Sequence, residues 1–438
     1  MERLLDFDPR VLVVAADDAL ISPLCEGLDQ LGWPTVTAQS MEAAESVLQD
    51  MTVDAAVIVC AGLHERDAIS RLRQGAAPRY LPILAIGSGF VEDQEADLTM
   101  SSAPHPAQAA LRLEQLSRAA IAEEEFRLRQ ATFAAHGVTL EASPAGEGPL
   151  QILTAGAADR RFLAMANALT EAGAEVVAAP TPYTAFDYLH ERAFDAAVLW
   201  GGQDHAPALS IASGMKRNTR LYHIPLVLYL RGAGEVELGD LFRRGFADVA
   251  AAETPEDETA ARVLALARNH RRRQAIRRAL DSVRGSDLTD AATGLFTREL
   301  FASHLARLAE GARSRNRALS VCVLRVAARE PVAQARQGGW LDRAMPQIGA
   351  MVSRLVRVED TAVRLGPELF ALALPATGGE AARMAAQRIS AVIACTAFDA
   401  GKDRSPFVVE FDVGVAEMEE GETPASVLER ASADLAKA

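Results

Sequence analysis

The segment RVEDTAVRLGPELF, residues 357–370, holds the side chains of this chain that are best suited to binding chemistry. Arg357 and Asp360 stand three residues apart, and five residues separate Asp360 from the turn sequence that begins at Gly366. A guanidinium offers a rigid fork of N–H donors and a carboxylate offers acceptor oxygens, so the pair can recognise the edges of a nucleotide without a metal ion. Considered alone, an Arg and an Asp at this spacing are usually a surface ion pair worth less than about 1 kcal/mol.

An internal repeat fills the first half of the chain. The sequence Asp-Ala-Ala-Val at Asp54 recurs at Asp195, and Gly32, which follows a helical run, recurs as Gly173; both pairs are 141 residues apart. In each copy short, fully apolar runs alternate with amphipathic helices, a pattern typical of parallel strands covered on both faces. We therefore predict two doubly wound α/β domains, at residues 9–133 and 150–270, joined by a linker rich in Gly, Ala and Pro.

The second half begins with a long helix, which we predict at residues 255–286. Pro255 suits a first helical turn, and acidic residues precede basic ones, which complements the helix dipole. The basic cluster HRRRQAIRR, residues 270–278, has the composition of a solvated or partner-facing surface, with a phosphate grip as the alternative. Residues 288–438 mix strand-like runs with helices and predict an α+β domain with antiparallel strand pairs.

Composition restricts the function classes. A formal charge of −14 opposes association with DNA, RNA or an anionic membrane. No apolar run approaches the roughly 18 residues of a membrane span, and the first residues lack the pattern of a signal peptide, so we expect a cytoplasmic protein. The four cysteines are far apart in apolar segments and are expected to be buried thiols rather than metal ligands or disulfides: Cys25, Cys60, Cys322 and Cys395.

The repeat resembles the CheY-like receiver domain of response regulators, which needs an acidic pair for Mg²⁺, an acceptor Asp after the third strand, and a Lys after the fifth. The first copy supplies Asp17 and Asp18, but the acceptor place holds Val59 and Cys60. The remaining receiver positions of the two copies fall on Ser88, Ala103, Asp159, Trp200, Tyr229 and Ala252. The resemblance therefore implies two pseudo-receivers that form no aspartyl phosphate and serve packing and contacts.

The last domain resembles the GGDEF domain of diguanylate cyclases. DAATGLFTRELF, which begins at Asp290, is similar to the opening motif D-x-L-T-G-L-x-N-R of that family, and RLGPELF stands where R-x-G-G-[DE]-E-F belongs. Two receivers ahead of a GGDEF domain resemble the PleD-like response regulators. This resemblance implies a cyclase-like α+β fold that handles guanine nucleotides.

The resemblance also implies that the catalytic positions are degenerate. The metal-binding Asp of the first strand falls on Arg325, which supplies no oxygen ligand and repels a cation. Gly366 and Glu368 persist in the signature turn, whereas Pro367 replaces a Gly and Leu369 replaces a Glu. We predict no catalytic residue, no metal site, no cofactor and no enzymatic activity. A residual diguanylate cyclase that makes cyclic di-GMP from GTP is the alternative.

In GGDEF domains an RxxD pair five residues before the signature forms an inhibitory site for cyclic di-GMP. Arg357 and Asp360 match this spacing, and Arg388 matches the third contributing arginine of the family. The resemblance therefore implies a non-catalytic effector with cyclic di-GMP as a regulatory ligand. The resemblance also implies location at the cell pole and protein partners, namely polar factors and a protease adaptor or substrate in cell-cycle proteolysis. It further implies a homodimer. A phosphorylated response regulator and a scaffold without a ligand remain open.

Overall fold

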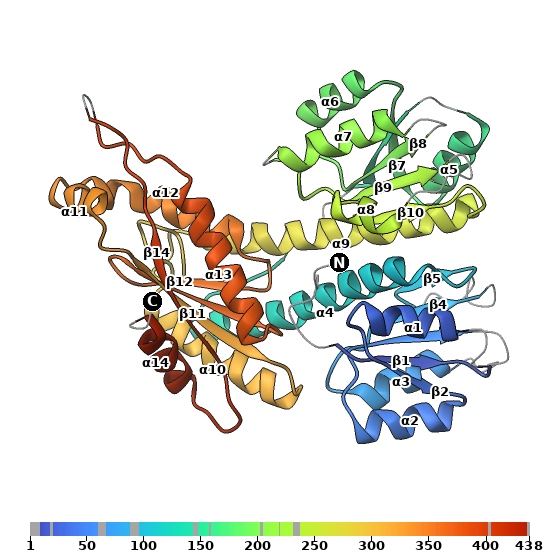
Figure 1. Ribbon diagram of the computed structural model, residues 1–438, viewed down its shortest axis with the longest axis horizontal. Coiled ribbons are helices and arrows are strands. Elements are labelled where there is room, and N and C mark those ends of the chain that lie inside the picture. Colours follow the sequence, from blue (N-terminus) through green and yellow to red (C-terminus); the bar gives the residue numbers. More distant parts are fainter. Residues whose placement is uncertain are drawn as a thin grey trace. The chain divides into compact units, whose positions relative to one another are not determined.

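A computed structural model describes residues 9–17, 21–59, 67–87, 96–142, 148–156, 159–201, 205–218, 220–230, 237–401 and 404–435 (Figure 1). The chain divides into two compact units. The N-terminal unit comprises Met1–Ala120 and Pro144–Ala275, and the C-terminal unit comprises Ile121–Ser143 and Ile276–Ala438.

The N-terminal unit contains two five-stranded parallel sheets, one for each copy of the repeat. The first sheet has the order β2-β1-β3-β4-β5, and the second has the equivalent order β7-β6-β8-β9-β10. The strands of the first sheet are β1 Val11–Val14, β2 Thr35–Ala38, β3 Ala55–Val59, β4 Ile83–Ile86 and β5 Leu98–Met100; those of the second are β6 Leu150–Ala155, β7 Ala174–Ala179, β8 Ala196–Gly201, β9 Leu226–Leu230 and β10 Asp248–Ala250. This strand order is that of flavodoxin-like, doubly wound folds.

Helices cover both faces of each sheet, as the fully apolar strands predict (Figure 1). The first copy contributes α1 Ser22–Gln30, α2 Met41–Asp50, α3 Ala68–Ala76 and α4 Pro106–Ala135; the second contributes α5 Arg160–Glu171, α6 Pro182–Glu191, α7 Ala206–Arg217, α8 Leu238–Arg243 and α9 Glu256–Ser282. The predicted doubly wound architecture is confirmed. Most of the segment predicted as a helix at residues 255–286 forms α9, which ends at Ser282.

The repeated Asp and Gly residues make equivalent hydrogen bonds and adopt equivalent backbone conformations in the two copies. The backbone N–H groups of Asp54 and Asp195 each donate to a carbonyl at the start of the first strand, at 2.8 Å in both copies. Their carboxylates accept hydrogen bonds from the same part of the chain, at 3.2 Å and 2.8 Å. Gly32 and Gly173 have φ angles of 82° and 84°, in the left-handed region where a side chain is unfavourable. The repeated residues therefore maintain the fold.

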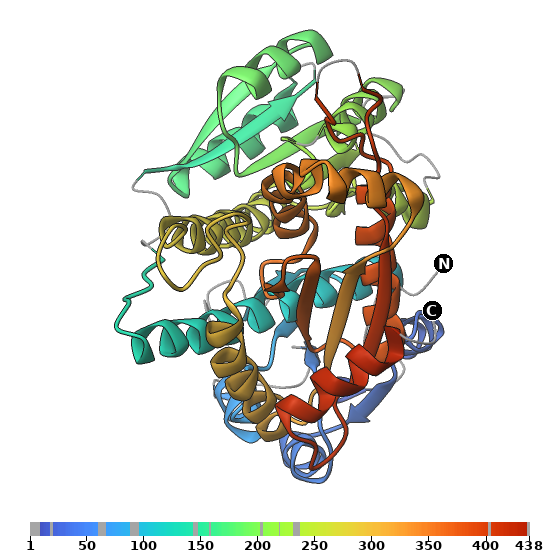
Figure 2. The ribbon, with the colours of Figure 1, turned by 90° about the vertical axis from the view of Figure 1, so that its left-hand side faces the viewer.

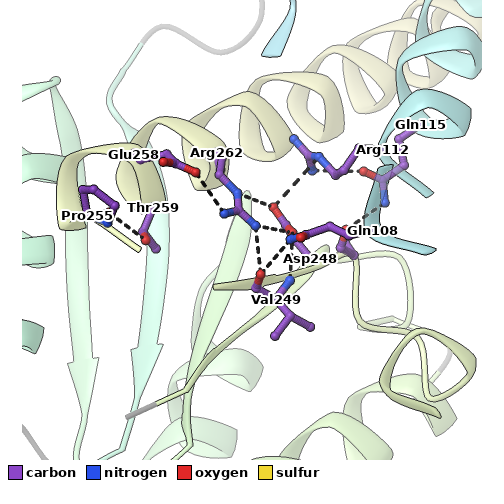
Figure 3. A network of polar contacts seen from close by, with 10 residues as sticks. Gln108, Arg112, Gln115, Asp248, Val249, Pro255, Glu258, Thr259 and Arg262 are labelled. Carbon is purple, nitrogen blue, oxygen red and sulfur yellow. Dashed lines mark hydrogen bonds and ion pairs between the residues drawn. The ribbon is translucent and has the colours of Figure 1, made fainter. Parts of the chain in front are cut away.

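Inside the N-terminal unit, a buried polar cluster links helix α4 of the first copy to helix α9 of the second copy (Figure 3). Asp248 on β10 is 1% exposed and accepts hydrogen bonds from Arg262 on α9 at 2.6 and 2.9 Å. Gln108, on α4, donates to the same carboxylate at 2.7 Å, and the Arg112 guanidinium lies 3.9 Å from it. Burial opposes ionisation, but Arg262 and Arg112 hold the pKa of Asp248 below its ordinary value. Burial lowers the pKa of Arg112 to about 10.

Helix α4 contributes to both units, and this differs from the predicted boundary at residue 133. The two units divide the helix near Ala120. Beyond that point Ala122, Phe126 and Phe133 are buried in a core of the C-terminal unit. The apolar side chains of this segment therefore pack against residues of the C-terminal unit.

The C-terminal unit contains a four-stranded sheet in the order β12-β13-β11-β14, with antiparallel neighbours throughout (Figure 2). Its strands are β11 Leu319–Val326, β12 Thr361–Gly366, β13 Leu369–Pro375 and β14 Phe411–Glu417; its helices are α10 Arg298–Ser314, α11 Glu330–Gln337, α12 Trp340–Leu355, α13 Gly379–Ala394 and α14 Pro424–Asp434. The predicted α+β sheet is confirmed. Alternate residues of the strands pack against α12 and α13 on one face, and against α10, α14 and the ends of α4 and α9 on the other.

The cysteine prediction is only partly correct. Cys25 and Cys322 are buried, but Cys395 is exposed because it caps the end of α13. Cys60 lies outside the described residues. No helix in the described parts of the chain is long and apolar enough to cross a membrane.

Candidate functional site

The RxxD segment forms a tight turn between α12 and β12. The backbone N–H of Asp360 donates to the carbonyl of Arg357 at 3.2 Å. In return, the backbone N–H of Arg357 donates to Oδ2 of Asp360 at 2.8 Å. Asp360 is 8% exposed, whereas Arg357 is half-buried. The two reciprocal hydrogen bonds therefore fix the carboxylate relative to the arginine backbone.

The turn lines a cavity of about 280 Å³ within the C-terminal unit. The charged side chains that line it are Arg129, Arg277, Arg284, Arg354 and Arg357 together with Asp281 and Asp360. Five arginines and two aspartates give these lining residues a formal charge of +3, in a chain whose formal charge is −14. The cavity therefore attracts anions, although the whole chain repels them.

The arginines of the cavity differ in what they already bind. Arg284 pairs with Asp281 at 2.9 Å and donates to the Ser353 hydroxyl at 2.9 Å. Arg277, on α9, and Arg354, on α12, make no ion pair or hydrogen bond with any residue that the structure describes. Their guanidinium groups are consequently available to bind an additional anion.

Arg129 on α4 forms hydrogen bonds with the end of the RxxD turn. Its Nη2 donates to the carbonyl oxygen of Asp360 at 2.8 Å and to the hydroxyl of Thr361 at 3.1 Å. Its Nε donates to Glu125 at 2.5 Å, and Glu125 also contacts Nε2 of His304 at 2.9 Å. Arg129, Glu125, Thr361 and His304 are each at most 2% exposed. The hydrogen bonds from Arg129, His304 and Thr361 all converge on Oε1 of Glu125, whereas its Oε2 is buried without a hydrogen-bond partner among the described residues.

The protonation state of His304 follows from this environment. Burial lowers the pKa of His304, even though Glu125 acts to raise it, so the imidazole is neutral at physiological pH. Because a carboxylate only accepts, the proton sits on Nε2 and is donated to Glu125. Nδ1 lies 3.0 Å from the hydroxyl oxygen of Thr132 on α4, and that hydroxyl also donates to the carbonyl of Leu128 at 2.8 Å. The imidazole thus links α4 to α10 without adding a charge.

Arg388 is the third residue that was predicted to bind the ligand. It is exposed on α13 and is not among the residues that line the cavity. The cavity lining thus includes Arg357 and Asp360 but not Arg388. The contribution of Arg388 to a ligand site stays a prediction.

The positions aligned with the catalytic hairpin are engaged by internal ion pairs. Arg325 on β11 pairs with Asp412 on the neighbouring strand at 3.0 Å. Glu368 receives both N–H groups of one edge of Arg336, at 2.7 and 2.6 Å. This fork geometry occupies both oxygens of the Glu368 carboxylate.

Pro367 and Glu368 form the two-residue turn between β12 and β13. Arg364 holds this turn, because it donates to the carbonyls of Gly366 and Pro367 at 3.3 and 2.9 Å. The same guanidinium reaches Asp290 at 3.1 Å and so links the turn to the DAATGLF motif. Leu369 begins β13 and stands opposite Arg325 in the sheet register.

The carboxyl edge of the second parallel sheet is filled by aromatic rings. Trp200 stacks on Tyr229 with centroids 4.5 Å apart, and Phe162 meets Trp200 edge to face at 5.4 Å. Gly156 has a φ of 135°, and a Cβ there would lie 2.4 Å from Cβ of Trp200. Asp159 caps α5 by accepting from the backbone of Phe162 at 2.9 Å. In the first copy Asp18, Cys60 and Ser88 lie outside the described residues.

Within the described ranges, no group of three or more His, Cys, Asp or Glu side chains is placed to hold a metal ion.

Sequence reasoning found the RxxD pair but missed most of the cavity. Arg277 belongs to the basic cluster 270–278, for which a phosphate grip was only the alternative. Arg354 precedes Arg357 by three residues, which places it near the end of α12 and next to the turn. No signal in the sequence connects Arg129 with Asp360, because 231 residues separate them.

Comparisons with known proteins concern the last third of the chain. The family model described as diguanylate cyclase, GGDEF domain, matches residues 287–438. A search of curated proteins found no match.

Solved structures with similarity include the GGDEF domain of DgcB from Caulobacter crescentus in complex with c-di-GMP, with 23% identity, 35% of this chain and 89% of that chain covered, and a TM-score of 0.33. The FimX GGDEF domain from Pseudomonas aeruginosa has 21% identity, 35% and 93% coverage, and a TM-score of 0.32. SiaD in complex with its activator SiaC, from the same organism, has 24% identity, 41% and 69% coverage, and a TM-score of 0.33. The family match, together with the DAATGLF and RLGPELF motifs, identifies residues 287–438 as a GGDEF domain.

Proposed function

We propose that this chain is an effector that binds cyclic di-GMP at Arg357 and Asp360 and does not synthesise it. One observation carries the proposal: the two residues line a single cavity whose charged side chains sum to +3. The arginine and the carboxylate of an RxxD turn are thus combined with further cations in a cavity large enough to admit part of a ligand.

The chemistry of the dinucleotide matches these groups. Guanine presents O6 and N7 as acceptors, which suit the forked donors of Arg357. Its N1 and N2 protons suit a carboxylate such as Asp360, which the turn holds in place. The two phosphodiesters carry negative charge, which the other arginines of the cavity attract.

Two contacts support the non-catalytic part of the proposal. Catalysis by two metal ions requires oxygen ligands on the first strand and on the hairpin. Arg325 occupies the strand position and pairs with Asp412, while both oxygens of Glu368 are engaged by Arg336. A metal ion would have to displace one guanidinium and withstand the charge of another.

The output that we propose is recruitment of proteins. Ligand binding changes how the cytoplasmic chain contacts its partners, and the two doubly wound domains provide contact surfaces rather than phosphorylation chemistry. Polar factors, a protease adaptor or substrate, location at the cell pole and a homodimer belong to this proposal through the resemblance to PleD-like regulators.

Calorimetry with cyclic di-GMP and the full chain tests ligand binding. Arg357→Gly and Asp360→Asn should each abolish measurable binding, whereas Arg298→Ala, which changes an exposed arginine of α10 outside the cavity, should leave it intact. Failure of the wild-type chain to bind refutes the effector function. Separately, conversion of GTP to cyclic di-GMP with Mg²⁺ by the purified chain would establish the cyclase alternative.

A further inference from the structure

We infer that Arg277 and Arg354 hold the phosphodiesters of the ligand, and that the bound ligand thereby ties the end of α9 to the RxxD turn. The inference rests on the proposed function, because it concerns the same cavity. It assigns a ligand role to two arginines outside the RxxD motif, one of them on the helix that leads into the GGDEF domain.

The first support is the arrangement of charge around the cavity. Arg129 and Arg284 are already engaged, by Glu125 and Asp281 respectively. Arg277 and Arg354 line the same cavity without an ion-pair or hydrogen-bond partner among the described residues. Placing cations together without acidic partners is unfavourable unless an anion joins them. A ligand with two phosphodiesters supplies this anion.

The second support is that the residues of the turn and the arginines of the helices suit different parts of the ligand. The Asp360 carboxylate is fixed by the backbone of Arg357, so these two residues are placed for the directional hydrogen bonds of a base edge. A phosphodiester accepts hydrogen bonds from many directions and suits long guanidinium side chains on helices. Arg277 is half-buried and Arg354 is exposed, so both can reorient without rearrangement of the core.

The consequence concerns α9. The cavity is lined by residues 277, 280 and 281 in the last turns of α9 and by residue 284 just after it, as well as by residues of the RxxD turn. A ligand that contacts both α9 and the turn must restrain this end of α9 against the GGDEF domain. Because α9 begins at Glu256, in the N-terminal unit, occupancy of the site acts directly on the chain segment that joins the two units.

The test is calorimetry with cyclic di-GMP on the full-length chain. Arg277→Ala and Arg354→Ala should each weaken binding about tenfold, as expected for loss of one charge-assisted contact, and the double variant about 100-fold. Arg278→Ala is the matched control, because Arg278 is the exposed neighbour on the same helix and does not line the cavity; its affinity should remain within about twofold of wild type.

Hydrogen exchange provides an independent readout. Added cyclic di-GMP should slow exchange of the amides at 276–284 in the wild-type chain and in Arg278→Ala, but not in Arg277→Ala. If Arg357→Gly loses binding while Arg277→Ala and Arg354→Ala bind as tightly as wild type, this inference is wrong and the effector function stands. If the wild-type chain does not bind, both are wrong.

Discussion

Replacement of Arg129 by Met should destabilise the C-terminal unit and weaken ligand binding at the same time. The side chain is 2% exposed and pairs with Glu125, which is equally buried. Met preserves much of the apolar stem but removes the donors to Glu125, to the Asp360 carbonyl and to Thr361. A buried carboxylate then keeps only the weaker donors His304 and Thr361.

The expected cost is large. Removing one partner of a buried, hydrogen-bonded ion pair typically costs about 3–5 kcal/mol, because the remaining charge is left without compensation. A domain has only about 5–15 kcal/mol of stability in total. The variant should therefore unfold at a clearly lower urea concentration, and the looser RxxD turn should bind cyclic di-GMP more weakly under conditions where the variant is still folded.

Urea unfolding, followed by circular dichroism, measures the free energy of unfolding. The matched control is Arg127→Met, which changes an exposed arginine of the same helix and should cost less than about 0.5 kcal/mol. The double variant Glu125→Leu/Arg129→Met removes both charges and should recover most of the stability, since apolar replacement of a whole buried pair is often neutral. A cost below about 1 kcal/mol for Arg129→Met alone would refute the reasoning.

Three further outcomes are expected. Because burial lowers the pKa of His304, the unfolded chain binds a proton that the folded chain does not, so the free energy of unfolding should fall as the pH drops below about 6.5. His304→Gln should remove part of this dependence in urea titrations at pH 7.5 and 5.5; unchanged dependence contradicts the neutral imidazole. Gly156→Ala should cost more than Gly148→Ala, because both have positive φ but only the former meets Trp200; equal melting temperatures would count against the aromatic packing. Asp248→Asn should cost about 3–5 kcal/mol in urea unfolding, because it removes the carboxylate beside the buried Arg112 guanidinium and leaves Arg262 with Glu258 alone; a cost no larger than that of the exposed Asp257→Asn would contradict this.

The strands of this protein could be predicted closely because local patterns determine them. The strand-like runs of the repeat fall on the parallel sheets, and the antiparallel pairs predicted for residues 288–438 are present between β11 and its neighbours. Helix α4 was less accessible to such reasoning. Its segment after Ala120 continues the helix and includes buried apolar residues. The spacing of apolar residues in the sequence does not tell which domain buries Phe126 and Phe133. Domain membership depends on contacts between distant segments, and periodicity contains no information about them.

The site shows the same limit. Arg357 and Asp360 were recognisable because their roles depend on a spacing of three residues, which one turn realises. The support from Arg129 and the charge from Arg277 arise only when α4 and α9 fold against the turn. Arg388 was assigned through resemblance alone, and the structure places it on the exposed face of another helix.

The hairpin, the edge of the second parallel sheet and the RxxD cavity differ in whether their side chains already have partners within the chain. At the hairpin Arg336 engages Glu368, and at the edge of the second parallel sheet Trp200 packs against Tyr229, so both places are filled by the chain's own side chains. In the RxxD cavity, by contrast, Arg277 and Arg354 face a space without acidic partners among the described residues. Because the charged residues that line the cavity have a formal charge of +3, an anion that enters reduces the repulsion among the arginines. This asymmetry favours ligand binding at the RxxD cavity over phosphoryl chemistry at either of the other two places.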